Sequence, residues 1–325
     1  MTFIRRISIM TSLMTGLCTI MAFGQEASSS PSATDVLLTV RGEVERPLKL
    51  SRADLSKLPR RSAQAKDHDG KESKYEGVML GEILQQAGVK FGKETLSIAA
   101  ASDLIYCLEE LNTAFQKTHP VVDLKVSTGS SGNFFAQIQN GAPFDVFLSA
   151  DLKYPKELIK AGLADSSSLT LYAIGRLVLW TIKPDIEVTR GLQILRDVKV
   201  KKLAIANPEH APYGRAAKAA LEHDKIWQMI QEKIVLGENI AQTAQFVQTG
   251  NVEAGIVALS LVVSPRLTKV GKFYEIPEAS YPRLEQAAVL TKRGKENPLA
   301  RTYLKFIRSE RARTIFDRYG FRLPE

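Results

Sequence analysis

Three short segments of the sequence place small or hydroxyl-bearing residues where a strand pattern gives way to a helix pattern. Ser102 follows the apolar run Ala99–Ala101, and Ser131 lies in the Gly/Ser segment 127–134. The third segment, 207–216, holds two prolines and a glycine before a helical pattern. Because the first turn of a helix has N–H groups without helical partners, each junction suits an anion. Taken singly, each also fits an ordinary serine cap, a Gly/Ser turn or a rigid connection.

The sequence lacks the motifs that would indicate a serine hydrolase, a phosphate-binding P-loop or a metal-cation site. A nucleophile elbow would need glycine where Asn133 stands, and no Lys-Ser/Thr pair follows the Gly/Ser segment as in a P-loop. The 4 histidines are scattered without zinc spacing, and the segment 67–70 is too short for a calcium loop. We therefore expect no enzyme, no cation site and no cofactor.

Strand and helix patterns alternate from about residue 95 onward. This order is typical of a mainly parallel sheet covered by helices, and the segment is longer than one small sheet needs. We expect an α/β fold with two lobes. The first lobe would comprise residues 95–181 and 278–325, and the second residues 182–277. A small α+β unit at 35–92 would precede them.

The first 24 residues are predicted to be a cleaved export signal. Arg5 and Arg6 precede an uncharged apolar run that ends near Phe23, with small residues on either side of that position. The run is near the lower length limit of a spanning helix, so an uncleaved anchor stays open as the alternative. Residues 25–34, rich in Ser and Ala, read as a flexible leader. We expect a periplasmic protein.

The net charge of the chain bears on whether its partner is a nucleic acid or a small anion. The formal net charge is +9, but the basic residues are dispersed, so we expect no nucleic acid. A mild positive field would speed encounters with small anions, or would only keep the chain soluble.

Without the signal, Cys107 is the one remaining cysteine and fits a buried helix position. We expect a monomer.

The order and spacing of several motifs resemble the periplasmic molybdate-binding components of ABC transporters. The resemblance spans residues 95–323, and its most specific pieces are Ala100–Leu104, Gly129–Asn133, Gly141–Asp151, Asn207–Gly214 and Ile315–Phe321. It implies the two-lobed fold of a type II periplasmic solute-binding protein. It also implies that the ligand is molybdate or tungstate and that the partner is an ABC transporter permease in the membrane.

The resemblance implies four oxyanion contacts. Ser102 and Ser131 match the family's serines, which offer hydroxyl and N–H groups. Tyr213 and Ile240 match positions that donate backbone N–H groups from helix starts. One position departs from the pattern, because some members have a tyrosine hydroxyl where this sequence has Ala258.

Such a site would select its ligand by protonation and by size. A site made only of donors favours a fully deprotonated oxyanion, because the proton of hydrogen phosphate would need an acceptor. Cavity volume must then separate molybdate and tungstate from sulfate, which is the runner-up in this class. The argument requires that the carboxylate of Asp103 points away from the ligand.

The unit at 35–92 has a separate resemblance. Its motifs Val40–Val44, Ser51–Leu55 and Tyr75–Leu84 are similar to a short fragment of sulfite-oxidase-type molybdopterin domains. Those enzymes hold the metal through a cysteine, which this unit lacks, so we expect a scaffold without cofactor. A molybdenum oxidoreductase or an accessory protein of one is the alternative from a different class.

Overall fold

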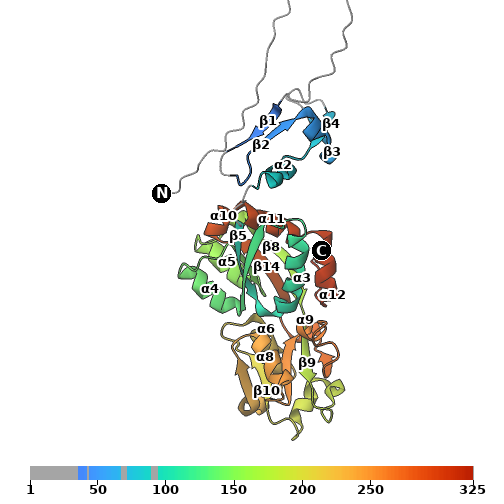
Figure 1. The fold of residues 1–325 in the computed structure, drawn as a ribbon. Helices are drawn as coiled ribbons and strands as arrows, with labels where there is room; N and C mark the ends of the chain where they lie inside the picture. The colour runs from blue at the N-terminus through green and yellow to red at the C-terminus, as the bar shows by residue number, and fades with distance from the viewer. Residues whose placement is uncertain (1–35, 42–43, 67–71, 89–93, 325) are drawn as a thin grey trace, which may run out of the picture. The chain divides into compact units, whose positions relative to one another are not determined.

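The computed structural model describes residues 36–41, 44–66, 72–88 and 94–324 (Figure 1). The chain divides into two units, one up to Gly92 and a larger one from Lys93 to Glu325. The expected export signal and leader, residues 1–34, lie outside the described residues. In the part that is described, no helix combines the length and the apolarity needed to cross a bilayer.

The N-terminal unit consists of two antiparallel strand pairs and two short helices. These elements are β1 (Val36–Val40), β2 (Leu48–Ser51), α1 (Arg52–Ser56), β3 (Arg60–Lys66), β4 (Glu72–Val78) and α2 (Leu80–Gln86). Strand β1 pairs with β2, and β3 pairs with β4. Helix α1 begins at a capping box, in which Ser51 and Asp54 each accept from the other's backbone N–H. Its small core contains Val40, Leu50 and Ile83.

The larger unit contains two five-stranded sheets, one for each lobe. Their strands are β5 (Glu94–Ala101), β6 (Val122–Gly129), β7 (Val146–Ser149), β8 (Thr170–Gly175), β9 (Leu177–Thr181), β10 (Leu203–Ala206), β11 (Ile234–Gly237), β12 (Ala254–Ala258), β13 (Lys272–Glu275) and β14 (Leu284–Leu290). The first sheet has the order β6-β5-β7-β14-β8, and the second has the order β11-β10-β12-β9-β13. The expected two-lobed α/β fold is present, with both sheets mixed.

Parallel strands occupy one part of each sheet. Strands β5, β6 and β7 run parallel in the first sheet, and β14 pairs antiparallel with β7 and β8. Strands β10, β11 and β12 run parallel in the second sheet, and β9 pairs antiparallel with β12 and β13. The carboxyl ends of parallel strands lie at one edge, which is where ligands bind in open α/β sheets.

Helices cover the faces of both sheets. The α-helices are α3 (Ile105–Gln116), α4 (Ser131–Gln139), α5 (Lys153–Lys160), α6 (Pro212–His223), α7 (Trp227–Ile230), α8 (Ile240–Gln248), α9 (Leu259–Val262), α10 (Lys292–Lys295), α11 (Pro298–Ile307) and α12 (Glu310–Arg318). The 3-10 helices are η1 (Ser102–Leu104), η2 (Ser166–Ser168), η3 (Val188–Arg196), η4 (Gln231–Lys233) and η5 (Glu278–Ser280).

Alternation along β5 explains why the first sheet is buried on both faces. Ile98 and Ala100 belong to a core cluster with residues of α3, α11 and α12. Ala99, between them, belongs to a second cluster with residues of α4 and α5. In Figure 1, α4 and α5 lie on one side of this lobe, and α3 and α12 on the other.

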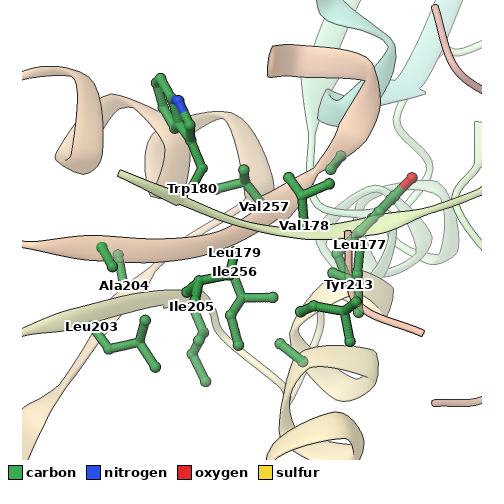
Figure 2. Packing of buried hydrophobic residues seen from close by; sticks show 14 of the residues in the cluster. Leu177, Val178, Leu179, Trp180, Leu203, Ala204, Ile205, Tyr213, Ile256 and Val257 are labelled. Atoms are coloured by element: carbon green, nitrogen blue, oxygen red, sulfur yellow. The ribbon is translucent and has the colours of Figure 1, made fainter. Parts of the chain in front are cut away.

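Strand β9 forms the centre of the core of the second lobe. Figure 2 shows its residues from Leu177 to Trp180 packed among Ile205, Ile256 and neighbouring residues of β10 and β12. We expected residues 177–181 in the first lobe, and that boundary is wrong. The chain passes between the sheets at Gly175–Arg176, because β9 pairs with β12 and β13. An apolar strand pattern does not indicate which sheet will take the strand.

Candidate functional site

A small cavity lies where the first sheet meets helix starts of the second lobe. Its volume is about 10 Å³, which is room for about one water molecule. It is lined by Ala101, Ser102, Asp103, Gly129, Ser130, Ser131, Ala150, Ala211, Pro212, Tyr213 and Ile240. The lining therefore includes all four residues that the family resemblance assigned to an oxyanion: Ser102, Ser131, Tyr213 and Ile240.

Ser102 enters the cavity because β5 ends at Ala101, beside the start of η1. Its side chain is buried, and its hydroxyl oxygen accepts from the backbone N–H of Ala241 across the cleft, at 3.4 Å. That contact uses a lone pair of the hydroxyl and leaves its proton free to be donated to a ligand.

Ser131 is the first residue of α4, directly after the N-cap Ser130. The Ser130 hydroxyl accepts from the N–H of Asn133 at 3.2 Å, and so satisfies one donor of the first turn. The Ser131 hydroxyl accepts from the N–H of Ala150 at 3.0 Å, which again leaves its own proton available. Among the described residues, nothing accepts from the backbone N–H of Ser131.

Tyr213 is placed at the cavity by the start of α6. Pro212 takes the first helical position, where a missing N–H costs little. A Cβ at Gly214 would lie 2.1 Å from the carbonyl oxygen of Ala206, so glycine lets α6 approach β10 closely. No acceptor in the described chain pairs with the backbone N–H of Tyr213.

Ile240 is likewise placed at the cavity by the start of a helix, α8. The Asn239 side chain caps this helix and accepts from the N–H groups of Ala241 and Gln242, both at 3.0 Å. The N–H of Ile240 is left without an acceptor among the described residues. Three helix starts, those of α4, α6 and α8, thus bring the positive ends of their dipoles to one cavity.

Asp103 also lines the cavity, although its carboxylate is an acceptor and the expected site consists of donors alone. Its Oδ2 accepts from the Tyr213 hydroxyl at 3.0 Å and from Gln286 Nε2 at 2.6 Å. Its Oδ1 is buried and has no hydrogen-bond partner among the described residues. Burial raises the pKa of this carboxyl to about 6, although hydrogen bonds from Gln286 and Tyr213 act in the opposite direction. The ionised form opposes a bound anion, so the donors must outweigh it.

Some proteins of the family that the sequence resembles have a tyrosine hydroxyl at the position of Ala258. No residue close to Ala258 in the sequence supplies a hydroxyl to this cavity. Ala258 is fully buried at the end of β12 and does not line the cavity. Ser260, two residues on, donates its hydroxyl to the backbone carbonyl of Asp103 at 2.8 Å. The hydroxyl-bearing residues of the lining are therefore Ser102, Ser130, Ser131 and Tyr213, and the Tyr213 hydroxyl is already donated to Asp103.

The lobes touch at the rim of the cavity. The N–H of Gly132 in the first lobe donates to the carbonyl oxygen of His210 in the second lobe, at 2.9 Å. Arg215 of α6 forms an ion pair with Asp151 of the first lobe, with 2.5 Å between Nη2 and Oδ2. These direct contacts show that the lobes are closed on each other.

No group of three or more His, Cys, Asp or Glu side chains that could hold a metal ion occurs in the described ranges. Cys107 is 1% exposed on α3 and packs in the core of the first lobe, as its sequence position predicted.

A family model for the bacterial extracellular solute-binding proteins matches residues 96–322. The chain belongs to this family. The match covers both lobes of the solute-binding protein and begins after the N-terminal unit. Its description is of solute binding, not of an enzyme.

Curated relatives and a solved structure agree with this assignment. The solute-binding protein is 37% identical to "Molybdate-binding protein ModA" of Azotobacter vinelandii over 70% of this chain and 90% of the relative. It is 38% identical to the ModA of Rhodobacter capsulatus over 59% of this chain and 75% of that relative. The periplasmic molybdate-binding protein of Azotobacter vinelandii superposes with a TM-score of 0.68 at 34% identity, over 71% of this chain and all of that one.

The family match starts at residue 96 and therefore does not include the N-terminal unit. The resemblance of this unit to sulfite-oxidase-type molybdopterin domains is therefore not supported. The expected periplasmic-binding-protein fold is confirmed for the larger unit, with mixed rather than mainly parallel sheets.

Proposed function

We propose that this protein captures molybdate, or the isostructural tungstate, outside the cytoplasm and delivers it to an ABC transporter permease. The observation that carries the proposal is the convergence of Ser102, Ser131, Tyr213 and Ile240 on one cavity between the lobes. The names of its curated relatives point to the same ligand. In this proposal residues 1–24 direct export, residues 25–34 form a leader, and the mature protein acts as a monomer.

The physical chemistry of the cavity suits a tetrahedral dianion. Two serine hydroxyls and the N–H groups at helix starts can each donate to an oxygen without bringing a mobile counter-ion into the site. Closure removes water, which strengthens these hydrogen bonds. Among the described residues that line the cavity, Asp103 Oδ1 is the buried side-chain acceptor without a partner, so it is the group that could accept the proton of hydrogen phosphate.

The alternative within this class is sulfate, which has the same charge and shape as molybdate but is smaller. The lining residues would have to close further around sulfate to keep all of their hydrogen bonds. The rim contacts of Gly132 and Arg215 hold the two lobes together, so the volume that the lining residues leave between them has to separate molybdate from sulfate.

Calorimetric titration of residues 25–325 with molybdate, tungstate, sulfate and phosphate tests the proposal. We expect tight binding of molybdate and tungstate, and binding of sulfate and phosphate that is weaker by at least roughly 100-fold, about 2.7 kcal/mol. Tight phosphate binding with no response to molybdate would overturn the proposal. Tight sulfate binding with a weak molybdate signal would select the alternative.

A further inference from the structure

Tyr213 extends from the cavity into a buried polar cluster between the lobes. Its backbone N–H has no acceptor among the described residues, whereas its hydroxyl lies 3.0 Å from Asp103 Oδ2 and 3.0 Å from Gln286 Nε2. Asp103 follows β5, and Gln286 is in β14, so both partners belong to the first lobe. All three side chains are at most 2% exposed.

This cluster lies against the segment through which the chain passes between the sheets. A Cβ at Gly175 would lie 2.2 Å from the Tyr213 hydroxyl and 2.9 Å from Gln286 Nε2. Glycine at this crossing point therefore makes room for the cluster. On the next strand, the N–H of Leu177 donates to the hydroxyl of Tyr281 at 3.1 Å.

The donors and acceptors in the cluster are clearly defined. Burial raises the pKa of the Tyr213 phenol far above its usual range, so the hydroxyl keeps its proton and donates. Gln286 Nε2 donates to Asp103 at 2.6 Å, and the Gln286 Oε1 accepts from Tyr172 at 2.9 Å within the first lobe. The first lobe thus holds an oriented acceptor, Asp103 Oδ2, for a hydroxyl that arrives with the second lobe.

We propose that Asp103 is a positioning residue, which binds the Tyr213 hydroxyl across the cleft and so fixes the start of α6 against the ligand. The inference rests on the proposed function and adds to it an interlobe hydrogen bond, from the Tyr213 hydroxyl to Asp103 Oδ2, which we call the latch. Opening of the lobes separates Tyr213 from both partners, so the two hydrogen bonds stabilise the closed state alone. A hydrogen bond to a carboxylate contributes more than a neutral one, so the latch lengthens the lifetime of the complex.

Tyr213→Phe tests the latch, because it removes the hydroxyl and keeps the backbone N–H and the ring. We expect molybdate to bind roughly tenfold more weakly, mostly through faster dissociation in stopped-flow measurements. The matched control is Tyr303→Phe, which removes a buried hydroxyl that donates to Asn112 at 2.7 Å within the first lobe. This control should lower the melting temperature and leave the dissociation rate unchanged.

A double-mutant cycle separates the latch from a general packing effect. Asp103→Asn replaces the charged acceptor by a neutral one, so Tyr213→Phe should cost several-fold less in that background. A merely structural role for Tyr213 predicts the same loss of affinity in both backgrounds. The cycle also cancels the direct effect of removing the charge of Asp103 from the cavity wall.

Closure itself is measured with spin labels at Lys160→Cys in α5 and Lys201→Cys before β10, because both lysines are exposed and Cys107 is buried. We expect Tyr213→Phe to shift the distances between the labels toward longer values, with and without molybdate. Wild-type rates and distances in Tyr213→Phe would overturn the latch and leave the proposed function intact. If the wild type binds none of the four oxyanions, the proposed function fails, and the distances of the ligand-free proteins alone decide the latch.

Discussion

Replacing Ser102 and Ser131 together by alanine is expected to weaken molybdate binding by roughly 2–6 kcal/mol, the sum for two hydroxyls that donate to a charged ligand. Both hydroxyl oxygens already accept from backbone N–H groups, of Ala241 and Ala150, so each side chain is fixed with its proton free. Alanine would put a methyl group in place of each hydroxymethyl group, so the oxyanion would lose both hydrogen bonds.

The measurement is calorimetry, supported by the melting temperature of the ligand-free protein. Ser131→Ala leaves the N–H of Ala150 without its acceptor, so some loss of stability is expected. Ser264→Ala is the matched control, because this serine is also buried but donates to the carbonyl of Leu261 outside the cavity. An affinity that stays within twofold of the wild type in the double variant would remove both hydroxyls from the site.

The junctions that hold Ser102, Ser131 and Tyr213 could be predicted from the sequence because each one follows a parallel strand, whereas the role of Ile240 came from the family resemblance. Ser102 and Ser131 come after β5 and β6, and Tyr213 and Ile240 come after β10 and β11. Local patterns locate such strand-to-helix junctions, and the carboxyl ends of parallel strands lie at a common edge. The sequence therefore indicated the halves of the site, and the family resemblance joined them.

The contacts between the lobes could not be predicted in this way. Tyr213 meets Asp103 over a separation of 110 residues, and Gln286 meets Asp103 over 183. Neither Gln286 nor Gly175 belongs to a local motif, and their neighbours are set by the pairing of β14 and β8. The assignment of residues 177–181 to the first lobe failed for the same reason, since a strand's partner is a long-range property.

Gly132→Ala should weaken molybdate binding by about 3 kcal/mol, more than 100-fold, by obstructing closure. A Cβ at this position would lie 2.6 Å from the carbonyl oxygen and from the Cβ of His210, which belong to the opposite lobe. It would also lie 2.6 Å from the Tyr154 hydroxyl, the end of a side chain that can rotate away. The hydrogen bond from Gly132 N–H to His210 would be lost with the close approach.

The open protein should tolerate this change, since alanine favours the first turn of α4 more than glycine does. We therefore expect an unchanged or higher melting temperature without ligand, and a much smaller rise in melting temperature when molybdate is added. Gly214→Ala is the control variant, because its Cβ would clash with the Ala206 carbonyl of the same lobe. We expect this variant to have a lower melting temperature both with and without ligand. A full ligand-induced rise in Gly132→Ala would show that the rim contact of Gly132 is not needed for capture, because closure on the oxyanion would then proceed around the added methyl group.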